Sequence, residues 1–192
     1  MKVLGIVCSP RLHGNTEILV QASLTKAQEE GAEIELVTLA GKTILPCDSC
    51  RTCSDTGKCH IKDHMQDIYP KLLEADGIIF GTPVYYWSVT AQAKALIDRT
   101  YVFRVKRNLR NKIVGVAVVQ EASGAVAALN VFSSFFTIQK MIMVGRAIGF
   151  GREKGEVKND KRGMAEAVWL GESIVKYIQS HEVPFIHERN FH

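Results

Sequence analysis

The order of apolar segments along this chain is the feature that most restricts its fold. Five short segments rich in apolar residues are expected to be strands, at residues 3–8, 34–39, 77–81, 113–119 and 143–148. The first of them is a continuous apolar run, which is typical of a strand that is covered on both faces of a sheet. Segments that we expect to be helical alternate with them, at residues 15–30, 63–74, 89–103, 125–140 and 163–179. Strands that alternate with helices favour a parallel sheet with helices on both faces. The sequence therefore predicts an α/β fold with five parallel strands.

The chain length and the absence of internal repeats predict a single domain. A chain of 192 residues suits one compact domain with a sizeable core. We expect this domain to span residues 1–180, with a cysteine-rich loop inserted at 41–62 and a C-terminal tail at 181–192. The Gly- and Lys-rich stretch 149–162 is expected to be an exposed loop.

Composition and charge exclude some classes of function. The chain is 46% hydrophobic and 23% charged, and no apolar run is long enough to span a bilayer. Its first residues are typical of a strand and not of a secretory signal. A net charge of +4 does not by itself indicate nucleic-acid binding. We therefore expect a cytoplasmic protein with no membrane and no nucleic-acid partner.

Basic residues are concentrated in one short stretch of the chain. They are Arg104, Lys106, Arg107, Arg110 and Lys112. Such a run usually decorates a solvated helix end and the loop that follows it. The alternative is a docking patch for an acidic electron-transfer partner or a nucleotide phosphate.

Four of the five cysteines fall within thirteen residues, in the pattern C-x2-C-x2-C-x5-C at Cys47, Cys50, Cys53 and Cys59. In a cysteine-poor chain without a secretory signal, this pattern indicates chemistry and not disulfide stapling. The close C-x2-C-x2-C run is typical of a loop that wraps an iron–sulfur cluster, and the fourth cysteine lies six positions on. Structural zinc usually takes two separated pairs of cysteines. Zinc, or free or paired thiols, remain the alternatives. Cys8 ends an apolar run and is expected to be a buried core residue.

The loop after the first strand has the composition of a phosphate site. In open α/β sheets, ligands bind beyond the carboxyl ends of the strands. Here Ser9, Asn15 and Thr16 offer polar side chains, Arg11 offers a positive charge, and a helix N-terminus follows. The segment is neither a Walker loop nor a G-x-G-x-x-G fingerprint, which argues against an ATPase or a Rossmann dehydrogenase. The alternative is an ordinary helix cap.

The loop after the third strand carries three consecutive aromatic residues, Tyr85, Tyr86 and Trp87. Three aromatic side chains in a loop are costly to expose unless a planar group covers them. An isoalloxazine ring would cover them, or they could pack on the cysteine loop or on another subunit. The small polar segment 120–124 after the fourth strand could line a third side of the same pocket.

Taken together, these motifs resemble a known family. Ser-Pro-Arg-x-x-Gly-Asn-Thr from Ser9, followed by Gly-Thr-Pro-Val-Tyr-Tyr-x-Ser-Val-x-x-Gln-x-Lys-Ala-x-Ile-Asp-Arg from Gly81 to Arg99, is similar to the NADPH-dependent FMN reductase branch of the flavodoxin-like proteins. With the cysteine pattern between them, the chain resembles the iron–sulfur flavoproteins of anaerobic archaea and bacteria. The resemblance spans roughly residues 2–150. It implies a flavodoxin-like three-layer sandwich, a sheet of order 2-1-3-4-5, and FMN at the carboxyl edge of that sheet.

The resemblance also implies roles for individual residues. The FMN phosphate would be held by Ser9, Arg11, Asn15 and Thr16. The ring would be framed by Pro83, Val84, Tyr85 and Ser88, and we expect Tyr86, Trp87, Glu121, Ser123 and Gly124 in the same pocket. The four clustered cysteines would ligate a [4Fe–4S] cluster. Such proteins assemble as homodimers or homotetramers, with the cluster of one subunit near the flavin of another.

The expected function is that of a redox protein. FMN paired with a [4Fe–4S] cluster would pass electrons between a reduced donor, ferredoxin or NAD(P)H, and an acceptor. We expect no catalytic acid or base, because a histidine in a loop is more often merely solvated. Arg51 and Lys58, beside the cysteines, are expected to favour the more negative cluster state. The alternatives are a cluster-free NAD(P)H-dependent FMN or quinone reductase and a zinc-bearing interaction module.

Overall fold

A five-stranded parallel sheet forms the centre of the protein. The computed structural model describes residues 1–180, so the expected tail at 181–192 lies outside the described residues. The strands are β1 (Lys2–Val7), β2 (Glu33–Thr38), β3 (Gly77–Pro83), β4 (Ile113–Gln120) and β5 (Ile142–Phe150). Their order in the sheet is β2-β1-β3-β4-β5, and every neighbouring pair is parallel. The predicted fold class and strand order are confirmed.

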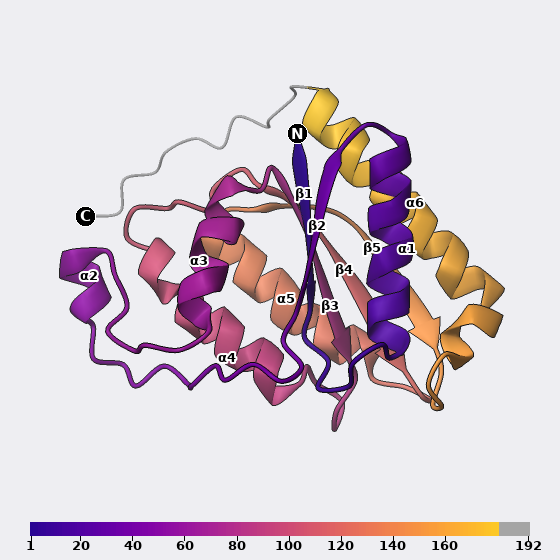
Figure 1. Cartoon of the computed structure of the whole chain (residues 1–192), viewed down its shortest axis with the longest axis horizontal. Helices are drawn as coiled ribbons and strands as arrows, with labels where there is room; N and C mark the ends of the chain where they lie inside the picture. Colours follow the sequence, from indigo (N-terminus) through magenta and orange to yellow (C-terminus); the bar gives the residue numbers. More distant parts are fainter. Residues whose placement is uncertain (181–192) are drawn as a thin grey trace.

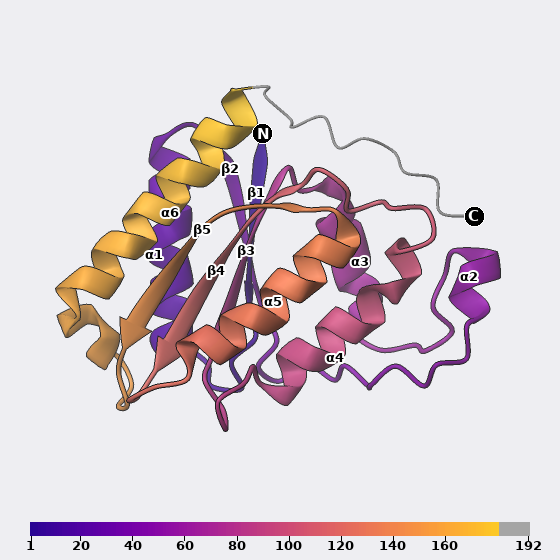
Figure 2. The ribbon, with the colours of Figure 1, turned by 180° about the vertical axis from the view of Figure 1, so that it is seen from behind.

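Helices cover both faces of this sheet (Figures 1 and 2). One face carries α1 (Asn15–Glu29) and α6 (Lys161–Gln179), and the other carries α3 (Met65–Glu74), α4 (Ala91–Arg99) and α5 (Ala125–Gln139). Alternate residues of β1 pack against the two helical layers, because successive side chains of a strand point to opposite faces of the sheet. Leu4 and Ile6 pack in the core under α3, α4 and α5, whereas Val3 and Val7 pack under α1 and α6.

Two close contacts show how tightly the layers pack. On one face, the ring of Phe80 lies 5.5 Å from the rings of Phe132 and Phe136, measured between centroids. On the other face, a Cβ atom added to Gly171 would stand 2.0 Å from the carbonyl oxygen of Ser23. Only glycine therefore allows α6 to approach α1 this closely. Both layers fix the sheet, and with it the loops at its carboxyl edge.

The cysteine segment lies between β2 and α3. Figure 1 shows it extending away from the sheet, on the side that carries α3 and α4. It contains one short helix that the sequence pattern did not indicate, α2 (Thr52–Thr56). Left-handed backbone at Arg51 (φ 61°) and Gly57 (φ 70°) bounds this turn of helix. A helix of five residues with no buried side chain has no apolar stripe that a sequence pattern could detect. Its position depends on the backbone geometry of the turns at its two ends.

The remaining elements differ little from expectation. The helix expected at 89–103 begins at Ala91, because Thr90 caps it through Ala93 N–H, and it ends in a 3₁₀ helix, η1 (Thr100–Phe103). A second 3₁₀ helix, η2 (Glu156–Asn159), lies in the stretch that we expected to be a loop. In the described part of the chain, no helix is both long enough and apolar enough to cross a membrane.

Candidate functional site

A cavity of about 430 Å³ opens at the carboxyl edge of the sheet. Its lining residues are Ser9, Arg11, Gly14, Asn15, Thr16, Pro83, Val84, Tyr85, Val119, Glu121, Gly151, Arg152 and Glu153. The structure therefore brings residues from the loops after β1, β3 and β4 to one place, as the topology requires. Backbone hydrogen bonds join these loops to neighbouring strands, from Val84 N to Val119 O (2.8 Å) and from Gly151 N to Gln120 O (3.1 Å).

The N-terminus of α1 lies at this cavity without a side-chain cap. Gly14 occupies the N-cap position, and no side chain there accepts a hydrogen bond from the first turn. The expected alternative, an ordinary cap by Ser, Asn or Thr, is therefore not what these residues do. Ser9 Oγ instead accepts the N–H of Arg11 (3.1 Å), and both Ser9 and Thr16 are buried. An uncapped helix N-terminus beside an arginine can bind an anion.

Asn15 holds the loop that follows β5. Its Oδ1 accepts hydrogen bonds from the N–H groups of Gly155 (2.8 Å) and Val157 (3.4 Å), and its Nδ2 donates to the carbonyl of Glu153 (2.8 Å). Within the described chain the side chain of Asn15 therefore anchors this loop, and its expected role in holding a phosphate stays a prediction. The anchored loop carries Arg152 to the cavity.

The loop after β5 was missing from the expected site. Gly151, Arg152 and Glu153 line the cavity, and Arg11 Nη1 donates to the carbonyl of Arg152 at 3.5 Å. A signal was available, because the carboxyl end of a fifth parallel strand reaches the same edge as the other four. The Gly- and Lys-rich composition of the stretch pointed only to a loop.

The three aromatic residues form a tight hairpin. Tyr85 and Ser88 exchange two backbone hydrogen bonds, of 2.9 and 3.0 Å, so Tyr86 and Trp87 occupy the turn. Both turn residues have left-handed backbone, with φ of 47° and 55°. Tyr86 is 97% exposed and Trp87 is 65% exposed, so these side chains do not pack on the cysteine loop of their own chain. Exposed aromatic residues in a strained turn are a place where function is expected.

This hairpin borders a second cavity, of about 310 Å³. Its lining residues are Val84, Tyr86, Trp87, Glu121, Ala122 and Ser123. Gly124 lies under the hairpin, since a Cβ atom there would stand 3.1 Å from Trp87 Cα. Ser88 is absent from the lining of both cavities, and its backbone closes the hairpin. Val84 and Glu121 line both cavities, so the two form one continuous region.

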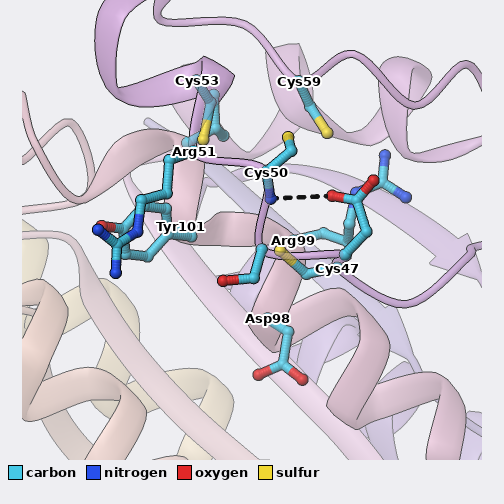
Figure 3. Close-up of a pocket in the computed structure, with 11 residues that line it drawn as sticks. Cys47, Cys50, Arg51, Cys53, Cys59, Asp98, Arg99 and Tyr101 are labelled. Carbon is cyan, nitrogen blue, oxygen red and sulfur yellow. Dashed lines mark hydrogen bonds between the residues drawn. The ribbon is translucent and has the colours of Figure 1, made fainter.

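The four clustered cysteines line a separate cavity of about 350 Å³. Figure 3 shows their side chains projecting from different parts of the loop toward a common space. Cys47 and Cys50 are exposed, whereas Cys53 and Cys59 are half-buried. Left-handed backbone at Ser49 (φ 60°) turns the chain between the first two cysteines. The other lining residues are Asp48, Ser49, Arg51, Asp98, Arg99, Tyr101 and Val102.

The four thiols of the loop interact electrostatically. Burial raises the pKa of the Cys53 thiol, and the thiols of Cys59, Cys47 and Cys50 raise it further, so the four groups lie within electrostatic reach of one another. Among the described residues, however, no three of these sulfur atoms lie within 4.8 Å of one another. Four thiols around one cavity can ligate either zinc or an iron–sulfur cluster.

The histidines near the two sites have local partners. His64 is an anchor of the cysteine loop, because its Nδ1 lies 3.0 Å from the N–H of Thr43 and its own N–H donates to Thr43 O (3.2 Å). His60 Nε2 lies 2.7 Å from Asp48 Oδ2. Asp48, Cys50 and His60 have ligand atoms within 4.8 Å of one another. All three residues are exposed, and such groups are common on protein surfaces without a bound metal ion.

Comparison with known proteins now identifies the family. Residues 1–154 match the model of the NADPH-dependent FMN reductase family. An iron–sulfur flavoprotein of Methanocaldococcus jannaschii is 40% identical over 189 residues, covering 93% of this chain and 98% of the relative. An iron–sulfur flavoprotein of Archaeoglobus fulgidus is 33% identical over 181 residues, covering 94% of this chain and 81% of the relative.

Solved structures agree on the fold. The structure of RosB with a bound 8-demethyl-8-formylriboflavin-5'-phosphate intermediate has a TM-score of 0.76 at 15% identity, covering 94% of this chain and 79% of that chain. Fold and family together define the class of protein, a flavin-dependent oxidoreductase with a flavodoxin-like sheet. The chain belongs to the NADPH-dependent FMN reductase family, in its iron–sulfur flavoprotein branch.

Proposed function

We propose that this protein is an electron-transfer flavoprotein that carries FMN and a [4Fe–4S] cluster. It passes electrons between a reduced donor, ferredoxin or NAD(P)H, and an acceptor. One observation carries the proposal: four thiols of one loop line a single cavity of about 350 Å³, apart from the cavity at the carboxyl edge of the sheet. The two cavities share no lining residue, so each can hold its own group.

The edge cavity suits the phosphate of FMN. The uncapped N-terminus of α1 presents free N–H groups, and the hydroxyls of Ser9 and Thr16 add further donors. The guanidinium of Arg11 supplies the countercharge, and Arg152 adds a second positive charge at the same cavity. An anion with two negative charges is therefore matched by polar groups on several sides.

The adjoining cavity suits a planar ring. Tyr86 and Trp87 line it, and their exposed rings would be covered by a bound flavin ring system. Val84 and Glu121 border both cavities and would lie where the ring and its phosphate-bearing chain meet. In this role the hairpin excludes water from one side of the ring. We propose that Pro83, Tyr85, Ser88, Ser123 and Gly124 hold the hairpin and the neighbouring loop in place.

The cysteine cavity suits an iron–sulfur cluster. Thiolates are the ligands that such clusters take. The relatives that are 40% and 33% identical are named iron–sulfur flavoproteins, which supports the same assignment. Arg51 lines this cavity, whereas Lys58 lies outside its lining. The positive charge of Arg51 would favour the more negative cluster state, and an unchanged cluster potential in Arg51→Ala would count against this role.

The two groups would supply complementary chemistry. Bound FMN exchanges one or two electrons, while an iron–sulfur cluster passes one at a time. The residues of this chain bind and orient the two groups, and we assign no acid or base to a proton transfer. The cluster-free alternative is a NAD(P)H-dependent FMN or quinone reductase. A Bacillus subtilis relative described as a putative NAD(P)H-dependent FMN-containing oxidoreductase is 24% identical and covers 87% of this chain, which favours it as the second candidate.

A reductive titration under anaerobic conditions tests the proposal. The wild-type protein should take up about three electrons per chain, two into flavin and one into the cluster. The double variant Cys50→Ala with Cys53→Ala should keep its flavin and take up about two. A wild-type protein that takes up only two electrons, unchanged in the double variant, would indicate the cluster-free reductase instead.

A further inference from the structure

A fully buried arginine lies beside the cysteine cavity. Arg99 is the last residue of α4, its side chain is 0% exposed, and it lines the cavity with the four thiols. Burying a guanidinium is costly unless its charge and its donors find partners. Its charge is balanced by Asp63, whose side chain is 3% exposed. Neither residue was predicted from the sequence to have a role at the cysteine loop.

The guanidinium of Arg99 binds both ends of the cysteine loop. Nη1 donates to Asp63 Oδ2 (2.6 Å) and to the carbonyl of Leu45 (2.9 Å). Nη2 donates to Asp63 Oδ1 (3.1 Å) and to the carbonyl of Ile61 (3.3 Å). Leu45 stands two positions before the first cysteine of the cluster, and Ile61 stands two positions after the last. One planar group therefore joins the start and the end of the loop.

Asp63 completes this clamp. Its Oδ2 accepts the N–H of Leu45 (2.8 Å), and its Oδ1 accepts the N–H of Met65 (3.0 Å) at the start of α3. Burial alone would raise the pKa of the Asp63 carboxyl, but hydrogen bonds from Arg99, Leu45 and Met65 outweigh burial and hold the pKa below its ordinary value. Both backbone groups of Leu45 are thus bound by the Arg99–Asp63 pair, which links the loop to α3 and α4.

Neighbouring side chains hold one end of the loop and the backbone of Arg99. Gln66 Nε2 donates to the carbonyl of Ile61 (2.6 Å), and Tyr69 Oη donates to the carbonyl of Arg99 (3.1 Å). Arg99 Nε is buried and has no hydrogen-bond partner among the described residues. An apolar pair of similar volume could stabilise the fold as well as a buried ion pair does. Apolar side chains could not bind the carbonyls at both ends of the loop.

We propose that Arg99 is the positioning residue of the metal site. By binding Leu45 and Ile61 together with Asp63, it holds the loop closed, so that the four thiols face one cavity before any metal is bound. This inference rests on the proposed function, in which the loop carries an iron–sulfur cluster. Arg99 touches the loop ends and acts through them. Groups that orient metal ligands in this way typically change metal affinity by 10- to 100-fold when they are replaced.

The variant Arg99→Lys tests the clamp. Lysine keeps the positive charge opposite Asp63 but lacks the planar fork that reaches both carbonyls. The matched control is Arg146→Lys, because Arg146 forms an exposed ion pair with Glu166 away from both sites. Four readouts are compared in each protein. Two report on the loop: amide hydrogen exchange of residues 41–62 without metal, and iron uptake from ferrous iron and sulfide under anaerobic conditions. The other two, flavin content and amide exchange of the sheet, report on the rest of the fold.

The proposal predicts that Arg99→Lys alters the amide exchange and iron uptake of the cysteine loop and leaves the sheet unaffected. Exchange at 41–62 should be at least about tenfold faster and iron uptake at least about tenfold lower than in wild type, while flavin content and sheet exchange stay the same. The Arg146→Lys control should match wild type in all four. Equal loop exchange and equal iron uptake in Arg99→Lys and in the control would overturn the proposal.

Two further outcomes keep the test decisive. If wild type takes up no iron, the proposed function fails, and the exchange comparison still decides whether Arg99 closes the loop. If Arg99→Lys does not fold, the wild-type protein without metal provides the test. The N–H groups of Leu45 and Met65 should then exchange as slowly as those of the sheet. A Leu45 N–H that exchanges as fast as an unprotected loop amide would overturn the proposal.

Discussion

Cys8 differs from the other four cysteines in its surroundings. It is fully buried in the core beside β1, and this burial raises the pKa of its thiol to about 12. A thiol with so high a pKa is almost entirely protonated at neutral pH, and the thiolate is the reactive form. The expectation from sequence, a small buried core residue, agrees with this position. Four thiols, and not five, are available for chemistry.

Alkylation at pH 8, before and after unfolding, tests the difference. At pH 8 the native protein without metal should react at the four loop cysteines within minutes, and Cys8 should stay unmodified because its pKa lies well above that pH. Cys8 should react only after unfolding in denaturant. Mass mapping of the modified peptides provides the measurement, and rapid native labelling of Cys8 would contradict the account.

Asn15 is the residue whose role the sequence described least completely. Its three hydrogen bonds to the loop after β5 place Arg152 at the edge cavity. The variant Asn15→Ala should lose about 1–3 kcal/mol of stability and bind FMN about tenfold more weakly, because the loop is released. The control Gln21→Ala removes an exposed hydrogen bond on the same helix and should change neither. Denaturant unfolding and flavin fluorescence titration measure both effects, and unchanged FMN affinity in Asn15→Ala would count against the anchoring role.

The aromatic hairpin is the element in which local preference and structure disagree most. Tyr86 and Trp87 both have left-handed backbone, which costs a non-glycine residue about 1–2 kcal/mol. Their rings gain little from burial in one chain, because both are exposed. A turn of this kind usually prefers Asn-Gly. Strain without a packing gain indicates that another group, such as a flavin or a second subunit, uses these rings.

Replacing the turn should separate stability from flavin binding. The double variant Tyr86→Asn with Trp87→Gly should be about 1–2 kcal/mol more stable than wild type without flavin, and it should bind FMN at least about tenfold more weakly. Lys140→Gly is the matched control, because Lys140 also has left-handed backbone (φ 58°) but lies at the end of α5. It should gain stability and keep FMN affinity. Undiminished FMN affinity in the double variant would contradict the proposed role of the rings.

At the level of elements, the sequence was most informative where apolar residues repeat. The buried strands and the longer helices followed from such repeats, and their bounds lie within a few residues of the structure. The short helices α2 and η2 have at most one buried side chain each, so they leave no periodic signal. Their positions depend on residues with left-handed backbone, such as Arg51 and Gly155. A glycine often has this backbone, whereas an arginine rarely does, so the geometry at Arg51 is visible only in the folded structure.

Across the whole molecule, topology explains what could be predicted about the sites. The loops after β1, β3 and β4 were expected at one edge, because parallel strands end together, and the cavity there collects them. Arg152 was missed because its loop carries no motif. Arg99 and Asp63 are 36 positions apart, and only the packing of α4 against the cysteine loop brings them together.

We expect the molecule to work as a homodimer or a homotetramer, and a ferredoxin-like electron donor also stays a prediction. Large apolar side chains remain exposed on α5 and α6, with Val126 69%, Ile138 59% and Trp169 52% exposed, and Tyr86 is almost fully exposed. Covering such side chains would stabilise an assembly. Sedimentation equilibrium of the flavin-loaded protein should give twice or four times the chain mass of 21.3 kDa. A monomer at micromolar concentration would contradict the expectation.

The central claim is that one chain holds both a flavin and an iron–sulfur cluster. Anaerobic purification followed by quantitation of flavin, iron, sulfide and zinc, with an absorption spectrum, tests it most directly. The account predicts about one FMN, about four iron and about four sulfide per chain, with flavin bands above a broad iron–thiolate shoulder. Flavin without iron would contradict the cluster assignment and leave the simple reductase. Zinc without flavin would contradict the assignments of both cavities.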